Sequence, residues 1–452
     1  MARKPIFFNL FELNNRTGDS HGLWRHSDSR HHDYNDIDFW VTIARKIEEG
    51  GFTALFLGDF FGASDVYRGS PDVAIRHAMQ FPSNDPSLLI PSMANATTTL
   101  NFVTTISTTY EHPFYVARRL STLDHLTKGR IGLNVVTSYI AAAARYFGLD
   151  EPIPHDRRYA IADEFLTVCY KLWESSWSDG AVRFDIENDV HIDPAMVRPI
   201  DHHGEFFKVA GPHVCEPSLQ RTPVIFQAGS SKAGRDFAAR HAECVFVQGR
   251  TLAAVKENVT NIRRRAVDFG RAPDDILIFH QQTAIVAPTQ AEARERLEEY
   301  ARYRSPESAL AQYCGSSGYD LSSLDPDAIL AYAQTEANQS RAAQYTTQSD
   351  RPFRVREVID DVGRFGDGIL VGTPVEIADQ LEAIVDETGV DGFNFNSIVT
   401  PRSIIDFVDQ VIPELRNRGR IAERRSTFRE TLFGNGRARS GNASRLAGLN
   451  AV

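Results

Sequence analysis

The stretch Pro223-Val-Ile-Phe-Gln-Ala-Gly-Ser-Ser231 is an apolar run that stops at a glycine, and the residues after it have helical spacing. A buried parallel strand that turns through Gly-Ser-Ser into a helix directs backbone N–H groups and the positive helix end at one point, where a phosphate or another anion binds. The same residues also suit an ordinary turn in which serine caps the helix. The stretch predicts a βα unit and marks a candidate anion site.

Further β-rich runs alternate with amphipathic stretches along the chain, which is the pattern of repeated βα units. We expect strands at 6–13, 53–57, 100–107, 131–136, 224–228, 244–248, 276–286 and 391–396. We expect helices at 38–49, 87–96, 113–126, 159–174, 233–242, 252–269, 374–388 and 404–416. Eight strands, each followed by a helix, predict an α/β protein with a closed (β/α)8 TIM barrel. An open doubly wound sheet is the alternative, although no G-x-G-x-x-G fingerprint supports it.

Three stretches exceed what a minimal barrel needs. They lie near 139–158, 177–212 and 291–365, and we interpret them as insertions into a single barrel domain that spans 1–417. Insertions that lengthen the loops after strands can roof the catalytic face and exclude water. The tail, 418–452, is rich in Arg, Gly, Ser and Asn and is expected to form an arm or a partly disordered end.

Charge and cysteine content exclude several classes of protein. The 49 Lys and Arg residues against 59 Asp and Glu residues give a formal charge of -10, which opposes a nucleic-acid or anionic-membrane surface. The four cysteines lack the spacing of a zinc site or a disulfide framework, and we expect no metal site. The N-terminus passes directly into a strand, without a signal peptide or membrane span, so a cytoplasmic location is expected.

Polar side chains are expected at the carboxyl ends of the strands, where the chemistry of a TIM barrel gathers. Asp59 follows the second strand, Thr105 lies in the third and Asn134 in the fourth. His155 and Tyr159 are four residues apart at a helix start, share one face, and can both donate to a phosphate. Each residue also has an ordinary interpretation, as a cap, a strand former or a cover of the core.

Several segments, in order, resemble the bacterial-luciferase-like flavin monooxygenases, specifically the group that acts on nitrilotriacetate, pristinamycin and dibenzothiophene sulfone. The resemblance covers most of the chain and is weaker beyond Pro288. The segments that carry it are His21-Gly-Leu-Trp-Arg-His26, Leu55 to Asp59, Ala117 to Leu126, Gly129 to Ser138, His155 to Phe165, Asp201 to Glu205, and Gln227-Ala-Gly-Ser-Ser231.

The resemblance implies the oxygenase component of a two-component enzyme. A separate NAD(P)H:FMN reductase supplies reduced FMN, and O2 is the co-substrate for oxidation of a small organic molecule at or next to nitrogen or sulfur, with possible C–N or C–S cleavage. It also implies a homodimer or homotetramer. Asp59, Thr105 and Asn134 match positions that line the isoalloxazine ring. Four residues match phosphate and ribityl contacts: His155, Tyr159, Ser230 and Ser231.

The substrate site is less defined. His21 is the candidate proton donor or hydrogen-bond partner near the flavin, because imidazole changes charge near neutral pH. A roof of aromatic side chains is expected to keep the site dry, with Trp24, Phe60, Phe61 and Phe246 as candidates. Four arginines are candidates for a carboxylate or sulfonate substrate or for the flavin phosphate: Arg25, Arg145, Arg157 and Arg158.

Three alternatives remain open at this stage. A deazaflavin-dependent oxidoreductase has the same barrel and transfers hydride without O2. A non-catalytic flavin-binding protein binds FMN without turnover. A metal-dependent hydrolase has only the pair His202-His203 beside Asp201 as a hint, and adjacent residues of a strand point to opposite faces.

Overall fold

Eight parallel strands close into a barrel in the computed structural model, which describes residues 4–229, 231–366, 368–434 and 436–448. The strands are β1 (Phe7–Leu13), β2 (Ala54–Gly58), β3 (Asn101–Ser107), β4 (Ile131–Val136), β9 (Val224–Gln227), β10 (Cys244–Val247), β11 (Leu277–Val286) and β13 (Gly392–Asn396). Strands consecutive in this order pair side by side, and β13 pairs with β1 to close the ring. The predicted (β/α)8 TIM barrel is confirmed.

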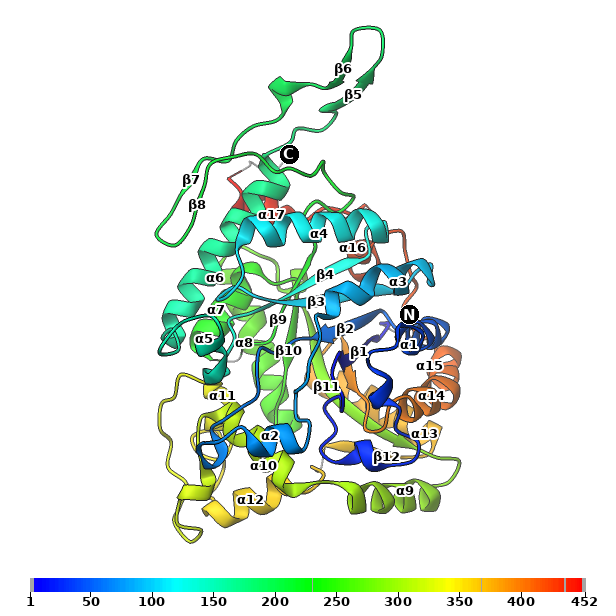
Figure 1. The fold of residues 1–452 in the computed structure, drawn as a ribbon. Coiled ribbons are helices and arrows are strands. Elements are labelled where there is room, and N and C mark those ends of the chain that lie inside the picture. Colours follow the sequence, from blue (N-terminus) through cyan, green and yellow to red (C-terminus); the bar gives the residue numbers. More distant parts are fainter. Residues whose placement is uncertain (1–3, 230, 367, 435, 449–452) are drawn as a thin grey trace.

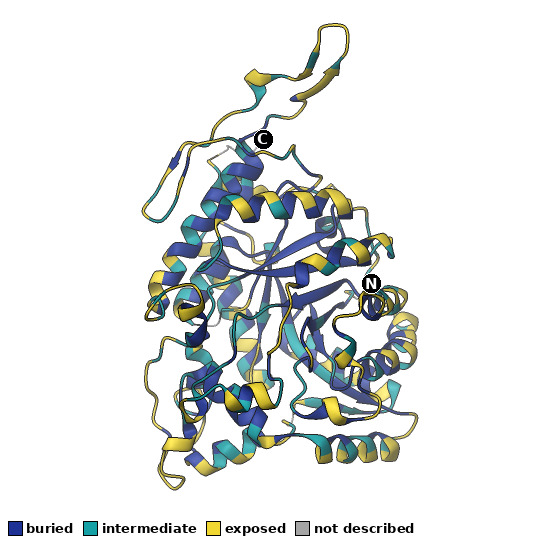
Figure 2. Ribbon diagram, viewed as in Figure 1, coloured by how far each residue is buried: buried dark blue, intermediate teal, exposed yellow. Residues whose placement is uncertain are grey.

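Helices surround the barrel on its outside (Figure 1). They are α1 (Ile37–Gly50), α3 (Ile90–Asn95), α4 (Pro113–Thr127), α6 (His155–Tyr170), α7 (Lys232–His241), α8 (Leu252–Asp268), α13 (Pro374–Thr388), α14 (Arg402–Asp406) and α15 (Ile412–Asn417). Their buried faces meet the strands and their exposed faces meet solvent (Figure 2). A further strand, β12 (Ile369–Gly372), pairs with the end of β11 outside the ring. The sequence pattern did not predict this strand, which directly follows the polar insertion at 291–365.

Side chains of the strands alternate between two apolar cores. Phe8 and Leu10 of β1 pack outward against the helices, whereas Phe7 packs inside the barrel. The barrel interior is dominated by phenylalanines, with the Phe56 and Phe246 rings 4.7 Å apart. Offset and edge-on aromatic pairs of this kind fill a barrel interior densely. The barrel is therefore closed below its carboxyl-terminal mouth.

Two loops at the carboxyl ends of the strands pack together into a lid. One follows β2 and carries α2 (Asp72–Arg76), and the other follows β11 and carries α9 (Gln290–Tyr303), α10 (Pro306–Ser317), α11 (Gln339–Ala343) and α12 (Val355–Gly363). They share a separate apolar core, in which Tyr67 and Met79 of the first loop join Leu310 and Tyr313 of the second. The third insertion at this end, after β4, carries α5 (Ala141–Tyr146).

The insertion at 177–212 lies at the other end of the barrel. It follows α6 and precedes β9, so it leaves the amino-terminal side of the sheet, and it contains the hairpins β5 (Val182–Asp185) with β6 (Val190–Ile192) and β7 (His202–His203) with β8 (Lys208–Val209). Figure 1 shows the first hairpin extending away from the barrel. This insertion therefore does not roof the catalytic face, because only a loop that follows a strand emerges there.

The tail folds back under its own barrel. Ile421 bridges to Ile6, and α16 (Phe428–Phe433) and α17 (Gly441–Leu446) follow. The Phe428 ring stacks on Phe226 at 5.7 Å inside the barrel and is fully buried. Apolar residues spaced within a polar segment supply this anchor, whereas the overall composition of the tail pointed to an arm or a partly disordered end. No described helix has the length and apolar content that crossing a membrane requires.

Candidate active site

Thr105 and Asn134 lie side by side at the barrel mouth. They are paired in register on β3 and β4, and the amide of Asn134 donates to Thr105 Oγ1 at 3.0 Å. Thr105 in turn donates to the carbonyl of Leu57 at 2.9 Å. Asn134 is 5% exposed, yet its Oδ1 has no hydrogen-bond partner among the described residues. A buried acceptor without a partner costs free energy, so this atom is available to a ligand that donates a hydrogen bond.

Asp59 begins the loop after β2. Its carboxylate accepts from the backbone N–H of Phe60 at 2.9 Å. Burial raises the pKa of Asp59 to about 7, and the nearby charge of Asp85 adds to the rise. The side chain is therefore partly protonated at neutral pH and can donate as well as accept, which suits the edge of a flavin ring.

This pKa predicts a pH-dependent stability. Between about pH 4 and pH 7 the folded chain holds a proton on Asp59 that the unfolded chain releases, so the free energy of unfolding falls as pH rises through this window. Asp59→Asn should remove the cost of ionising this buried carboxyl group. We expect the free energy of unfolding to rise by roughly 1–2 kcal/mol at pH 8, after discounting for partial exposure, and to change little at pH 4. Urea unfolding at both pH values tests this. Asp268→Asn, at an exposed position, is the control, and an equal effect at pH 4 and 8 would contradict the prediction.

The quoted turn after β9 is packed around the hydroxyl of Tyr159. Ser231 caps α7, accepting from the backbone N–H of Gly234 at 3.1 Å. A Cβ atom at Gly229 would lie 2.5 Å from Tyr159 Oη, so glycine is required there. The Tyr159 hydroxyl also reaches the side chains of Ser231, Thr137 and Gln227, and burial raises its pKa. Ser230, the other predicted serine, lies outside the described residues.

Arg158 is a buried cation next to the corner that Gly229, Ser231 and Tyr159 form. Arg158 is 3% exposed and donates to the carbonyl of Glu336 at 2.5 Å. Its Nε has no hydrogen-bond partner within the described part of the chain, and the nearby charge of Glu336 acts to raise its pKa. Burial lowers its pKa, although a guanidinium remains charged in proteins. Glu336 offsets part of this buried charge, and an anionic ligand at the free Nε would offset more of it.

The lid reaches the same corner through Glu336. Its carboxylate accepts from the backbone N–H of His155, the first residue of α6, at 2.5 Å. The His155 ring contacts Asp156 at 2.8 Å and packs edge-on against Tyr159. His155, Tyr159 and Ser231 are thus brought together at the junction of α6, α7 and the lid.

His21 contacts the lid at α10. Its Nδ1 is 3.1 Å from Ser308 Oγ and its Nε2 is 2.7 Å from Gln312 Oε1, both on α10. Burial lowers its pKa to about 4, so the ring is neutral near pH 7, with Nε2 donating to Gln312 and Nδ1 accepting from Ser308. The ring lines a small cavity with Met79 and Gln80. Both ring nitrogens therefore form hydrogen bonds with side chains of the lid.

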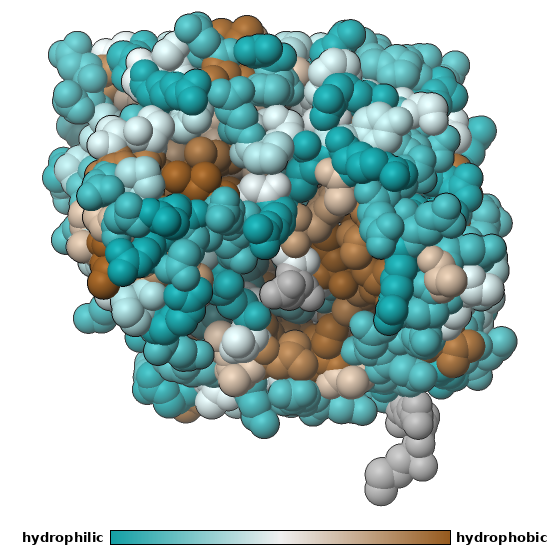
Figure 3. Space-filling model, turned by 90° about the horizontal axis from the view of Figure 1, so that it is seen from below, coloured by the Kyte–Doolittle hydropathy of each residue, from teal (hydrophilic) through white to brown (hydrophobic). Residues whose placement is uncertain are grey.

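Aromatic side chains line the roof in part as predicted. Phe60 packs against Tyr139, and Phe61 against Tyr110 and Phe147. Phe246 instead belongs to the floor, because it points into the phenylalanine layer of the barrel, and Trp24 is 45% exposed. Viewed from the lid end, the molecule has a hollow with an apolar wall (Figure 3).

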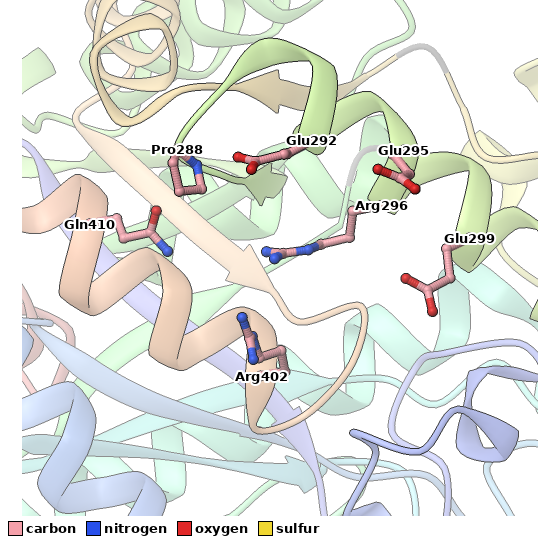
Figure 4. A pocket seen from close by; sticks show the side chains of 7 residues that line it. All are labelled: Pro288, Glu292, Glu295, Arg296, Glu299, Arg402 and Gln410. Carbon is pink, nitrogen blue, oxygen red and sulfur yellow. The ribbon is translucent and has the colours of Figure 1, made fainter.

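A larger pocket, of about 390 Å³, lies outside the barrel between α9 and α14 (Figure 4). Three of its charged lining side chains are bound to neighbours outside the pocket. Arg296 and Arg402 both bind Asp406, at 2.7 and 2.9 Å, and Glu299 is 3.2 Å from His26. This charged cleft touches the end of β11, where Arg296 donates to the carbonyl of Val286, but it lies outside the ring of strands and holds none of the predicted site residues, so we place the chemistry at the barrel mouth.

Comparison with known proteins agrees with this arrangement. The sequence profile described as luciferase-like monooxygenase matches residues 20–392. The chain belongs to the luciferase-like monooxygenase family. It is a flavin-dependent monooxygenase, and the predicted resemblance is confirmed by matches to nitrilotriacetate, dibenzothiophene-sulfone and pristinamycin IIA enzymes.

Three relatives of this luciferase-like monooxygenase are especially similar. A long-chain alkane monooxygenase from Geobacillus thermodenitrificans is 47% identical over 96% of both chains, and a solved structure of a long-chain alkane monooxygenase superposes with a TM-score of 0.92 over 100% of both chains. A dimethyl-sulfide monooxygenase from Hyphomicrobium sulfonivorans is 44% identical over 93% of this chain and 88% of its own. A riboflavin lyase crystallised with modified FMN and riboflavin is 37% identical, with a TM-score of 0.93 over 99% and 100% of the chains.

Two residues of this luciferase-like monooxygenase that contact Tyr159 or His155 had no role assigned from the sequence. Gln227 lies inside the quoted stretch, and its Oε1 is buried without a partner among the described residues. The strand pattern alone did not indicate that its side chain turns toward Tyr159. Glu336 lies in a polar insertion, more than 100 residues from α6 in sequence, where no local signal marks it.

Proposed function

We propose that this chain is the oxygenase component of a two-component monooxygenase that receives reduced FMN from a separate NAD(P)H:FMN reductase. The buried guanidinium of Arg158, whose Nε has no hydrogen-bond partner among the described residues, carries the proposal. A phosphate group would accept a hydrogen bond from this Nε and add to the countercharge of Glu336, because phosphate binds arginine through charge-assisted hydrogen bonds. A relative that is named as component A of nitrilotriacetate monooxygenase supports the separation from a reductase.

The residues divide into two groups around the flavin. Arg158, Tyr159, Ser231 and the amino-terminus of α7 would hold the phosphate, with His155 beside them. Ser230 remains a contact implied by the resemblance. Thr105, Asn134 and Asp59 would face the ring at the mouth. When bound, reduced FMN and O2 convert a substrate R–H into R–OH, with oxidised FMN and water as the other products.

The substrate we propose is a small, mainly apolar molecule, with a thioether oxidised at the carbon next to sulfur as the first candidate. Three arginines considered for anionic substrates are engaged elsewhere. Arg145 pairs with Asp65, Arg157 with Glu205, and Arg25 donates to the carbonyl of Gly22. The floor of the mouth is phenylalanine. The names of the alkane and dimethyl-sulfide relatives also support a small, mainly apolar substrate.

Binding of the phosphate is tested by a double variant, Ser231→Ala with Tyr159→Phe. Each change removes a neutral hydroxyl from the anion site, so we expect reduced FMN to bind at least about 10-fold more weakly while the fold is kept. Anaerobic stopped-flow titration measures the affinity. An unchanged affinity would refute the assignment of the corner.

Turnover is tested by oxygen uptake with enzymatically reduced FMN across dialkyl sulfides, n-alkanes and amines. We expect uptake coupled to oxidation of a sulfide, supported by any NAD(P)H:FMN reductase because free flavin passes between the proteins. Flavin binding without any substrate-coupled uptake would favour a non-catalytic flavin protein. Hydride transfer to a deazaflavin without O2 would favour the oxidoreductase alternative.

A further inference from the structure

Asn9 of β1 and Asn394 and Asn396 of β13 point into the barrel. Asn9 follows Phe7, which belongs to the barrel interior, by two residues, and Asn394 and Asn396 flank Phe395, which packs outward. The three asparagines are 0%, 7% and 8% exposed. Four of their atoms, the Oδ1 of each and the Nδ2 of Asn9, have no hydrogen-bond partner among the described residues. Buried polar atoms in this state cost free energy unless a ligand pairs with them.

These asparagines lie across the barrel from the residues that we assign to the flavin ring. β13 is the fourth strand from β4 in either direction around the ring of strands, so Asn394 faces Asn134. Between them the rings of Phe56 and Phe246 meet edge-on at 4.7 Å. With the observed strand register, these four inward side chains of alternate strands form one layer of the barrel. The phenylalanine pair therefore separates two polar sites.

The asparagines share their side of the barrel with a fourth amide. Asn394 is paired in register with Asn9 on one neighbouring strand and with Gln281 of β11 on the other. We call Asn9, Gln281, Asn394 and Asn396 the amide wall. The described inward side chains of these three strands carry no charge. A ligand of the amide wall is therefore uncharged, because a charged group would be buried there without a partner of opposite charge.

We propose that the amide wall binds an uncharged hydroxyl group of the substrate, an inference that rests on the proposed function and narrows its substrate class. A hydroxyl group donates one hydrogen bond and accepts others. The wall offers it oxygens that lack a donor and, at Asn9, an N–H group that lacks an acceptor. A purely apolar substrate would leave these buried atoms unpaired. The preferred substrate is a mainly apolar thioether that carries one hydroxyl group.

The first test compares thioethers that differ only at one end. 2-(Methylthio)ethanol and 3-(methylthio)propan-1-ol are each compared with the sulfide in which a methyl group replaces the hydroxyl. Oxygen uptake with reduced FMN gives kcat/KM for each compound. We expect the hydroxyl-bearing member of at least one pair to be favoured by about 30-fold or more, because a site built to bind a hydroxyl strongly rejects the analogue without it.

Variants of the wall should remove this preference without removing turnover. Asn394→Leu should reduce the ratio of the two kcat/KM values to less than about 3-fold and should not lower kcat/KM for the plain sulfide, because leucine has a similar branched shape and no polar atoms. Asn9→Val, deeper in the barrel, is a second variant with the same expected direction. Gln282→Leu is the matched control and should keep the ratio. Its amide lies next to Gln281 in sequence but faces outward, where it donates to the carbonyl of Gly368 at 2.6 Å.

A second measurement does not need turnover. Calorimetric titration of both members of a pair into the protein loaded with oxidised FMN should show the same preference, and Asn394→Leu should abolish it. Equal binding or turnover of both members would overturn this inference and leave the proposed function intact. A crystal structure with a bound thioether alcohol, in which ordered water alone occupies the amide wall, would overturn it too. A binding preference without turnover of any sulfide would support the amide wall and contradict the proposed function.

Discussion

Arg158→Met should weaken binding of reduced FMN by about 30- to 1,000-fold, the effect of removing one member of a buried charge pair. The same change should leave the stability of the flavin-free protein unchanged or raise it. In that state Arg158 is a buried cation with an unpartnered Nε, and we expect the cost of burying it, which methionine removes, to be at least as large as its attraction to Glu336. Anaerobic titration and urea unfolding measure the two quantities.

Arg157→Met provides the control for this variant. Arg157 precedes Arg158 on α6, but its side chain is 58% exposed and pairs with Glu205 at the surface. We expect little change in either the affinity for reduced FMN or the free energy of unfolding. If Arg158→Met instead unfolds the protein, or binds flavin as tightly as the natural chain, Arg158 does not hold the phosphate.

Arg429→Met should lower the free energy of unfolding by about 3–5 kcal/mol, because it leaves a buried carboxylate without its partner. Arg429 is 1% exposed and binds Glu243 through Nε at 2.7 Å and through a second nitrogen at 3.0 Å. It also donates to the carbonyls of Thr222 and Ala438, which ties the tail to the strand end below β9. Thermal and urea unfolding measure the loss.

A second change separates the ion pair from general packing. Combining Arg429→Met with Glu243→Met removes both charges, and the double variant should be more stable than Arg429→Met alone. Arg437→Met, at a position 60% exposed in the same tail, should have little effect. A double variant less stable than the single one would show that the tail is held by something other than this pair.

The barrel could be predicted because its strands and helices carry strong periodic patterns. The eight predicted strands match the observed ones within two residues at their ends, because each is a short β-rich apolar run that is buried on both faces. The tail could not be predicted in this way. Its anchors, Phe428 and Arg429, are two residues in a polar segment, and their partners Phe226 and Glu243 lie far away in sequence.

The candidate site was predictable where it lies on the barrel itself. Thr105, Asn134 and Asp59 are placed at the mouth by strand register, and Tyr159 and Ser231 meet because α6 and α7 are neighbours. The contacts of the lid could not be predicted in this way, because loops that pack against one another have no periodic sequence pattern. Nothing local indicated that His21 binds α10 or that Glu336 caps α6. Whether His21 acts on the flavin stays a prediction.

The structure of the chain crystallised with FMN tests the central claim most directly. We predict density for the phosphate within hydrogen-bonding distance of the Arg158 guanidinium, at the turn that ends in Ser231, with the ring extending toward Thr105 and Asn134. Flavin bound elsewhere, for example in the charged cleft between α9 and α14, with the corner at Tyr159 empty, would contradict it.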